Sequence, residues 1–146
     1  MQLTKTLVAA IVAASAATAA PTADKKSMMA AVPQWTIVNM TRICAKDDSD
    51  CIWSFGINTH LADTTDCKLD VAGPGAPQAN GGPSDCGNYT VTSGWSGQFG
   101  PGNGFTTLAV VDNKARLIAF PAYTDKQVEG GNVVTPDQSY AVAALG

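Results

Sequence analysis

The chain has 146 residues and a mass of 15.0 kDa, which is the size of one domain. Only 14% of its residues are charged, and it has a single His and a single Glu. Three Trp and four Phe residues argue against a disordered chain, and nine Lys and Arg residues are too few for a nucleic-acid binder. The lone His excludes chemistry that needs several imidazole groups.

Residues 1–20 (MQLTKTLVAAIVAASAATAA) have the pattern of a secretory signal peptide. Lys5 supplies the positive charge, and the apolar run that follows is shorter than the ~20 residues that span a bilayer. Residues 21–26 end in Lys25-Lys26, which is either the dibasic processing site of a propeptide or a charged linker. We therefore expect residues 27–146 to form a single secreted, extracellular β-rich domain that does not insert into a membrane.

The predicted mature domain is acidic. Removal of residues 1–26 leaves six basic and eleven acidic side chains, a net charge of −5. A surface of that sign repels polyanions and anionic lipids, so nucleic acid is not an expected partner. A domain of this length still buries roughly two thirds of its unfolded surface, which is enough for a core.

Four cysteines remain after the leader: Cys44, Cys51, Cys67 and Cys86. An even count in a short exported chain indicates two disulfides. No Cys-x-x-Cys pair occurs and His60 stands alone, so we expect neither a metal site nor a cofactor. Of the three possible connectivities we favour Cys44–Cys51 and Cys67–Cys86, because each bond closes a segment that resembles a loop between strands. Closing the longer loop contributes about 3 kcal/mol in the chain-entropy model.

The first half of the domain predicts strands. Residues 35–44 are rich in β-branched and aromatic side chains, and residues 51–58 alternate between apolar and polar positions. The acidic stretch 45–50 fits the turn of an antiparallel hairpin; it resembles a calcium loop less well, because it lacks the required Gly and Glu. Residues 67–71 are a short third candidate. The Gly- and Pro-rich stretch 72–87 predicts a loop without regular structure.

Three further strands are expected at residues 89–95, 105–111 and 115–121, the last two joined by a hairpin turn at 112–114. Short strands separated by turn signals indicate a mainly β protein. We therefore expect an antiparallel β-sandwich or a small β-barrel, with two disulfides and one or two short helices near the C-terminus.

The helices are predicted by capping patterns. Thr124 to Gln127 fit a capping box, and Gly130-Gly131 would end that helix. A second capping box begins at Thr135, with Pro136 at the first helical position. The pattern leaves open whether residues 136–145 continue as a helix or pair as a strand.

No catalytic site emerges from the sequence. Residues 94–98 (GWSGQ) differ from the G-x-S-x-G nucleophile motif at the fifth position, and the glycines and proline that follow Ser96 cannot form the helix that the motif requires. His60, the only imidazole that a triad could use, is expected in a solvated loop. No two carboxylates stand out as the pair that glycoside hydrolysis needs. We therefore expect a protein that is not an enzyme, with no catalytic residues.

Trp95, Phe99 and Phe105 lie in a Gly-rich segment and are the candidate surface contacts. We favour the interpretation in which Trp95 and Phe105 face the core and Phe99 closes the mouth of a barrel. In the alternative, the three rings lie on an exposed loop, where they stack on sugar rings or pack against a partner protein. If the domain has a binding surface, this loop is the first choice for it.

Two N-glycosylation sequons occur, at Asn39-Met40-Thr41 and Asn88-Tyr89-Thr90. Asn88 lies opposite Tyr89 in the strand alternation, so it is expected to face solvent. Asn39 has the parity of Trp35 and is expected to face the core. Asn88 is therefore the favoured glycosylation site, and Asn39 a possible one.

Residues 93–101 (SGWSGQFGP), with Gly104-Phe105-Thr106 after them, resemble a signature of small cysteine-containing proteins secreted by fungi. The segments 120–125 (FPAYTD) and 136–140 (PDQSY) resemble the same group. Some of its members are described as elicitors that trigger the hypersensitive response of plants. The resemblance covers roughly residues 35–142 and implies an effector-like protein with no known catalytic residues.

Three functions follow from these observations. The first is a non-enzymatic secreted effector or elicitor of plant defence that acts by protein–protein recognition, with an unknown extracellular protein as its partner. The second is a module that binds a cell-wall glycan or a small ligand through Trp95 and Phe99. The third is a secreted hydrolase with an unrecognised site.

Overall fold

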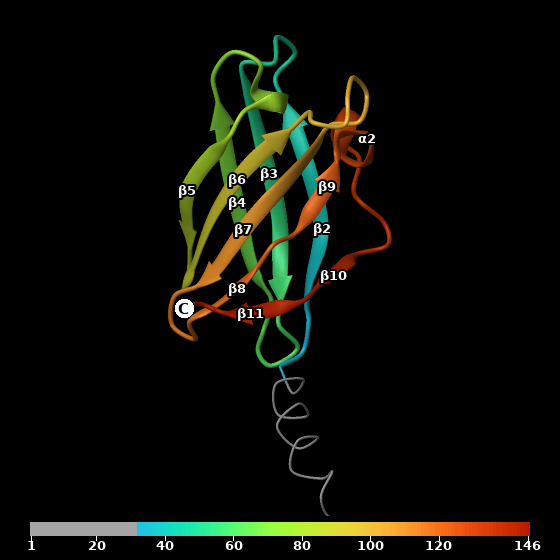
Figure 1. Cartoon of the computed structure of the whole chain (residues 1–146). Coiled ribbons are helices and arrows are strands. Elements are labelled where there is room, and N and C mark those ends of the chain that lie inside the picture. The colour runs from blue at the N-terminus through green and yellow to red at the C-terminus, as the bar shows by residue number, and fades with distance from the viewer. Residues whose placement is uncertain (1–31) are drawn as a thin grey trace, which may run out of the picture. The chain divides into compact units, whose positions relative to one another are not determined.

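The computed structural model describes residues 32–146, and Pro33–Gly146 form one compact unit. The predicted signal peptide and the Lys25-Lys26 site lie outside the described residues. Figure 1 shows the elements in chain order, which are β2 (Trp35–Cys44), β3 (Asp50–Asn58), β4 (Thr65–Ala72), η2 (Ala76–Gln78), β5 (Gly81–Cys86), β6 (Tyr89–Ser96), β7 (Phe105–Asp112), β8 (Leu117–Ala119), β9 (Ala122–Thr124), α2 (Asp125–Val128), η3 (Glu129–Gly131), β10 (Gln138–Tyr140) and β11 (Val142–Ala144).

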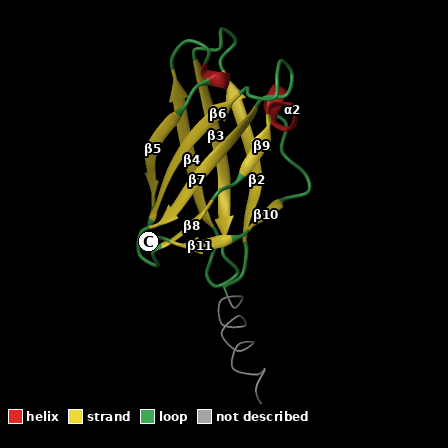
Figure 2. Cartoon of the chain, in the orientation of Figure 1, coloured by secondary structure: helices red, strands yellow, loops and turns green. Residues whose placement is uncertain are grey.

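The strands form two antiparallel sheets (Figure 2). One sheet has four strands in the order β10-β2-β3-β4. The other has six, in the order β11-β8-β7-β6-β5, with β9 also paired to β7. The prediction of a mainly β, antiparallel fold with two disulfides is confirmed.

The two sheets are linked to each other along both of their edges. At one margin the Cys67–Cys86 disulfide joins β4 to β5, and the hydroxyl of Ser84 donates to the carbonyl of Lys68 at 2.9 Å. At the other margin β10 and β11 are separated by Ala141 alone, yet β10 pairs with β2 and β11 with β8. Contacts within the chain therefore cover parts of both sheet edges, which limits their pairing with other chains.

The core lies between the sheets and follows the predicted alternation on β3, where Cys51, Trp53, Phe55 and Ile57 are buried. Trp35 of β2 meets Tyr89 of β6 edge to face, with ring centroids 5.8 Å apart. The other buried residues of this core cluster are Ile37, Met40, Cys67, Leu69, Val71, Val91, Leu108, Val110, Ala119, Tyr123, Val128 and Val134. Both sheets thus contribute alternate residues, as in other β-sandwiches.

The prediction that Asn39 faces the core is wrong. A β-bulge between Val38 and Thr41 shifts the register of β2 against β3, and Asn39 takes the left-handed φ of 54° that Asn tolerates. Beyond the bulge the inward positions are Met40 and Arg42, and Asn39 is exposed.

Two other predictions are corrected. Residues 72–87 are not all irregular, because η2 and the strand β5 lie within them. Pro83 is accommodated because β5 is a terminal strand with a register shift between Gly81 and Ser84, where a missing N–H breaks no ladder bond. The second capping box forms no helix, because the backbone of β10 pairs with residues 35–37 of β2 instead.

Two local predictions are confirmed, whereas the strand expected at residues 115–121 is shorter, because β8 covers only Leu117–Ala119 and a separate strand, β9, begins at Ala122. Thr124 caps α2 through a complete capping box with Gln127. The predicted β7–β8 hairpin also forms, with its turn at residues 113–116 rather than 112–114, and a side-chain oxygen of Asp112 accepts hydrogen bonds from the backbone of Lys114 and Ala115. Within residues 32–146, no helix has the length and apolar character needed to cross a membrane.

Candidate functional site

The β6–β7 connection, residues 97–104, projects at one end of the body (Figure 1). Phe99 at its tip is 65% exposed. The Phe99 ring stacks on Phe105 at the start of β7, with centroids 5.8 Å apart and an interplanar angle of 26°. A shallow groove of about 260 Å³ adjoins the pair and is lined by Phe99, Phe105, Ala122, Tyr123, Thr124 and Gln127.

The loop tip is held by short-range hydrogen bonds. The N–H of Gly100 donates to the carbonyl of Gly97 at 3.0 Å, and the N–H of Asn103 donates to the carbonyl of Gly100 at 3.1 Å. The side-chain amide of Asn103 also donates to the carbonyl of Phe99 at 3.3 Å. These successive turns fix the backbone that carries the Phe99 ring.

The loop base is held by Trp95 and Asp125. The indole N–H of Trp95 donates to the Asp125 carboxylate, at 3.0 and 3.2 Å from its two oxygens, and the Asp125 N–H donates to the carbonyl of Gly104 at 3.0 Å. The Trp95 ring lies against two glycines, so that a Cβ at Gly97 would be 2.5 Å from its Cη2 atom, and one at Gly104 would overlap the Asp125 carboxylate. The glycines therefore permit the close approach of the loop ends to the indole.

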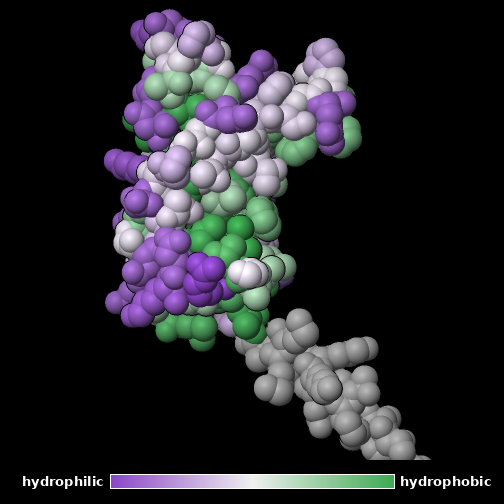
Figure 3. Space-filling model, turned by 60° about the vertical axis from the view of Figure 1, so that its left-hand side comes forward, coloured by the Kyte–Doolittle hydropathy of each residue, from purple (hydrophilic) through white to green (hydrophobic). Residues whose placement is uncertain are grey.

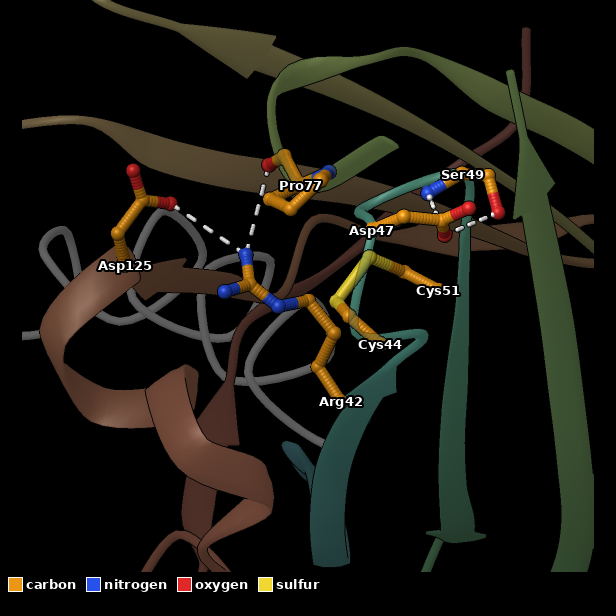
Figure 4. Close-up of a disulfide and its surroundings, with 7 residues drawn as sticks. All are labelled: Arg42, Cys44, Asp47, Ser49, Cys51, Pro77 and Asp125. Atoms are coloured by element: carbon orange, nitrogen blue, oxygen red, sulfur yellow. Dashed lines mark hydrogen bonds and ion pairs between the residues drawn. A yellow bond between two sulfur atoms is a disulfide. The ribbon is translucent and has the colours of Figure 1, made fainter. Parts of the chain in front are cut away.

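Asp125 also connects the loop base to β2 through Arg42 (Figure 4). The Arg42 Nη1 atom lies 3.7 Å from the Asp125 carboxylate and donates to the carbonyl of Pro77 at 3.4 Å. The guanidinium carbon lies 5.7 Å from the centre of the Trp53 ring, a cation–π distance. Arg42 is only 7% exposed, and its Nε–H has no hydrogen-bond partner. A buried cation therefore depends on Asp125 as its counter-ion.

The favoured interpretation of the three aromatic residues is wrong in part. Phe99 covers no barrel mouth, because its ring is largely exposed. Phe105 has the outward parity on β7, where Thr106 and Leu108 face inward, and its half-buried ring stacks on Phe99. Trp95 is half-buried at the end of β6. Sequence alternation could have placed Phe105 outward, because Leu108 and Val110 mark the opposite face.

The structure does not bring His60 and Ser96 together. His60 lies in the loop after β3, and Ser96 ends β6 at the opposite end of the body (Figure 1). The His60 Nε2 atom is hydrogen-bonded to the Thr36 hydroxyl at 2.7 Å, and the Ser96 hydroxyl accepts from the N–H of Gln98. Among residues 32–146, no group of three or more His, Cys, Asp or Glu side chains is arranged to hold a metal ion.

The acidic β2–β3 turn is organised by its own side chains. The Asp47 carboxylate accepts from the hydroxyl of Ser49 at 2.6 Å and from its N–H at 3.1 Å, and these bonds lower the pKa of Asp47. The hydrogen bond between Asp50 and Asp70 raises the pKa of Asp50. Below this turn the Cys44–Cys51 disulfide bonds directly opposed residues of β2 and β3.

Apolar side chains are also exposed on the body of the sandwich. Hydrophobic residues gather in the lower half of the face seen in Figure 3, beside hydrophilic ones at its left margin. Phe120, between β8 and β9, is 54% exposed, close to the value for Phe99. The two phenylalanines differ in their surroundings. Phe99 projects from the 97–104 loop, whose base is hydrogen-bonded to the sandwich through Trp95 and Asp125.

Comparison with known proteins shows the family. The family described as Effector TSP1 matches residues 36–145. The chain belongs to this family. A protein of Hypocrea virens (strain Gv29-8 / FGSC 10586), named Effector TSP1, is 60% identical over 146 residues, which cover 99% of each chain. The Effector TSP1 match contains both disulfides, the 97–104 loop and α2, and it agrees with the resemblance to small fungal effectors.

Proposed function

We propose that this member of the Effector TSP1 family is a secreted, non-enzymatic elicitor of plant defence that recognises a host protein outside the fungal cell. The family and the named relative support an effector role. The recognition surface is the end of the domain formed by the 97–104 loop. The observation that carries this choice is the exposed Phe99 ring on a loop whose base is bonded to the sandwich.

An exposed phenylalanine is a suitable anchor for a partner protein. Aromatic side chains in a partner's pocket dominate many interfaces, and burying a Phe ring contributes about 1.5–3 kcal/mol. Truncation of Phe99 to Ala therefore weakens binding roughly 10- to 100-fold. The bonded loop base limits the conformational entropy lost on binding.

The test is infiltration of leaves with purified mature protein. We expect necrosis and an oxidative burst with the wild type, and a loss of both with Phe99→Ala at the same concentration. Phe120→Ala is the matched control, because it removes another exposed phenylalanine ring, which lies between β8 and β9 and outside residues 97–104. Protein that has been reduced and alkylated tests the need for the disulfide-bonded fold. Absence of a response to the wild type removes the elicitor role, and a response equal in wild type and Phe99→Ala removes the proposed surface.

Binding of a cell-wall glycan is the second candidate, favoured by the stacked Phe99–Phe105 pair. Exposed ring faces beside polar groups such as Thr124 and Gln127 suit the apolar faces and hydroxyls of sugars. Pull-down on chitin, glucan and cellulose distinguishes the two functions. Retention on one polysaccharide that is lost in Phe99→Ala but kept in Phe120→Ala favours the glycan.

A further inference from the structure

The β-bulge of β2 presents the Asn39 sequon on the outside of the domain. Asn39 is exposed, and its backbone is fixed because its N–H donates to the Asp137 carboxylate at 2.9 Å. On the other side of the bulge the Met40 carbonyl accepts from the N–H of Val134 at 2.9 Å. Among the described residues, the hydrogen bonds of Asn39 involve its backbone, and its side-chain amide is left to solvent.

A depression lies beside Asn39 on the outer face of the four-stranded sheet. Its volume is about 420 Å³, in the range of small-ligand sites, and its lining includes Val38, Ser54, Asp66 and Lys68. Its apolar surface is the Val38 side chain, which packs over the backbone of Gly56, where a Cβ would lie only 2.7 Å from it. An apolar surface with a hydroxyl, a carboxylate and an ammonium group around it matches a sugar ring, which has C–H faces and polar edges.

We propose that Asn39 is an N-glycosylation site and that the first N-acetylglucosamine of the glycan lies in this depression. The proposal rests on export of the chain, which is part of the proposed function. The donor is a lipid-pyrophosphate-linked oligosaccharide of the secretory pathway. The Asn39 Nδ2 atom bonds to the anomeric carbon of the first sugar, the bond from that carbon to the pyrophosphate oxygen breaks, the lipid pyrophosphate leaves with the electron pair, and Nδ2 releases a proton.

A glycan at this position covers the outer face of β2, β3 and β4. It leaves the 97–104 loop uncovered, because that loop belongs to the other sheet. The sugar would therefore direct a partner protein toward the loop end. Asn88, in the exposed turn between β5 and β6, is an additional predicted site at another place on the surface.

The test uses the full chain, exported from yeast both with its own leader and behind an added host signal. Asn39 is kept, because a substitution there disturbs the left-handed backbone; Thr41→Val destroys the sequon and Thr41→Ser preserves it. Mapping of peptides after deglycosylation in heavy-oxygen water marks each modified Asn. We expect Asn39 to be marked in wild type and Thr41→Ser, and unmarked in Thr41→Val.

Thermal unfolding tests the position of the first sugar, in an Asn88→Gln background. An endoglycosidase that leaves one N-acetylglucosamine should keep the melting temperature of the glycosylated protein, while complete loss of the glycan in Thr41→Val lowers it by about 2–4 °C. The same variants made in bacteria measure the effect of the substitution alone.

Each result has one meaning. Unmodified Asn39 in protein exported by the added signal overturns the glycosylation site. Modified Asn39 with no stability gain from the single sugar overturns the placement in the depression. Modification with the added signal but no export by the native leader counts against the proposed function alone.

Discussion

Substitution of Asp125 by Ala removes both interactions that its side chain makes at the loop base. The half-buried indole N–H of Trp95 loses its acceptor, which costs about 1–2 kcal/mol. Arg42 loses its counter-ion, but the 3.7 Å separation and the 28% exposure of Asp125 reduce that contribution to about 1 kcal/mol. The expected loss is therefore about 2–3 kcal/mol, or roughly 8–12 °C in the melting temperature of a domain this size.

Two further variants separate the contributions. Asp125→Asn retains an amide oxygen for the Trp95 N–H and removes only the charge, so we expect a loss of about 1 kcal/mol. Trp95→Phe removes the N–H and keeps most of the ring. A double-mutant cycle of Trp95→Phe with Asp125→Ala should give a coupling energy above about 0.5 kcal/mol, because the two side chains are in direct contact.

The assay is equilibrium unfolding in urea with the disulfides intact, and the control is Asp63→Ala in the exposed loop after β3. Surface substitutions of that kind change stability by about 0.5 kcal/mol or less. If Asp125→Ala is no more destabilising than Asp63→Ala, the network does not hold the loop and the reasoning is refuted. Faster amide exchange across residues 97–104 in Asp125→Ala would locate the effect.

Two other predictions concern packing and pH. Gly104→Ala places a methyl group against Trp95 and should lower the free energy of unfolding by about 1–3 kcal/mol. In the control Gly94→Ala the nearest atom lies 3.7 Å from the added methyl group, so the free energy of unfolding should change by no more than about 0.5 kcal/mol. Urea unfolding of both variants measures the difference. Asp70→Asn should lower the pKa of Asp50 toward its ordinary 3.8, measured by NMR titration. Because the folded-state pKa of Asp50 is raised, its contribution to stability is present below pH 3.8 and is lost as the pH rises through the folded-state pKa. The Asp70→Asn variant should not show this loss of stability. An unchanged Asp50 pKa in Asp70→Asn would contradict the interaction between the two carboxyl groups.

The fold was predictable where the signal is local. The alternation of Cys51, Trp53, Phe55 and Ile57 identifies a face of β3 without knowledge of its neighbours, and a capping box identifies the start of α2 at Thr124. Turn composition likewise located the β2–β3 and β7–β8 hairpins. These patterns act within a few residues, so the sequence contains them in full.

The incorrect predictions concern features that distant segments determine. The backbone N–H of Asn39 in the bulge donates to Asp137, almost a hundred residues away, and parity counted from Trp35 cannot include such a contact. The Thr135 capping box forms no helix because β2 offers the following residues a strand partner. β5 exists because β6 supplies its hydrogen bonds, despite Gly82 and Pro83.

The residues of the candidate site could be predicted from the sequence, but the contacts that hold the loop could not. The Gly-rich run marked residues 97–104 as a loop with aromatic content, and this much follows from turn chemistry. The counter-ion role of Asp125 was not predictable, because Arg42 stands in a strand at a position that alternation from Trp35 assigns to solvent. A buried Arg after a bulge becomes visible only when the register is known.

At the proposed recognition surface Phe99 supplies contact area and Asp125 supports the loop, so substitutions of the two residues should affect binding in different ways. Phe99 supplies contact area, so its truncation should raise the dissociation rate while leaving the free loop unchanged. Asp125 is partly buried and supports the loop from α2, so its removal should weaken binding through the entropy of ordering residues 97–104. Calorimetry with a cognate partner should therefore show a smaller heat of binding for Phe99→Ala and a more unfavourable entropy for Asp125→Ala. If the two variants showed the same changes in binding enthalpy and entropy, Asp125 would not act by restricting the loop before binding.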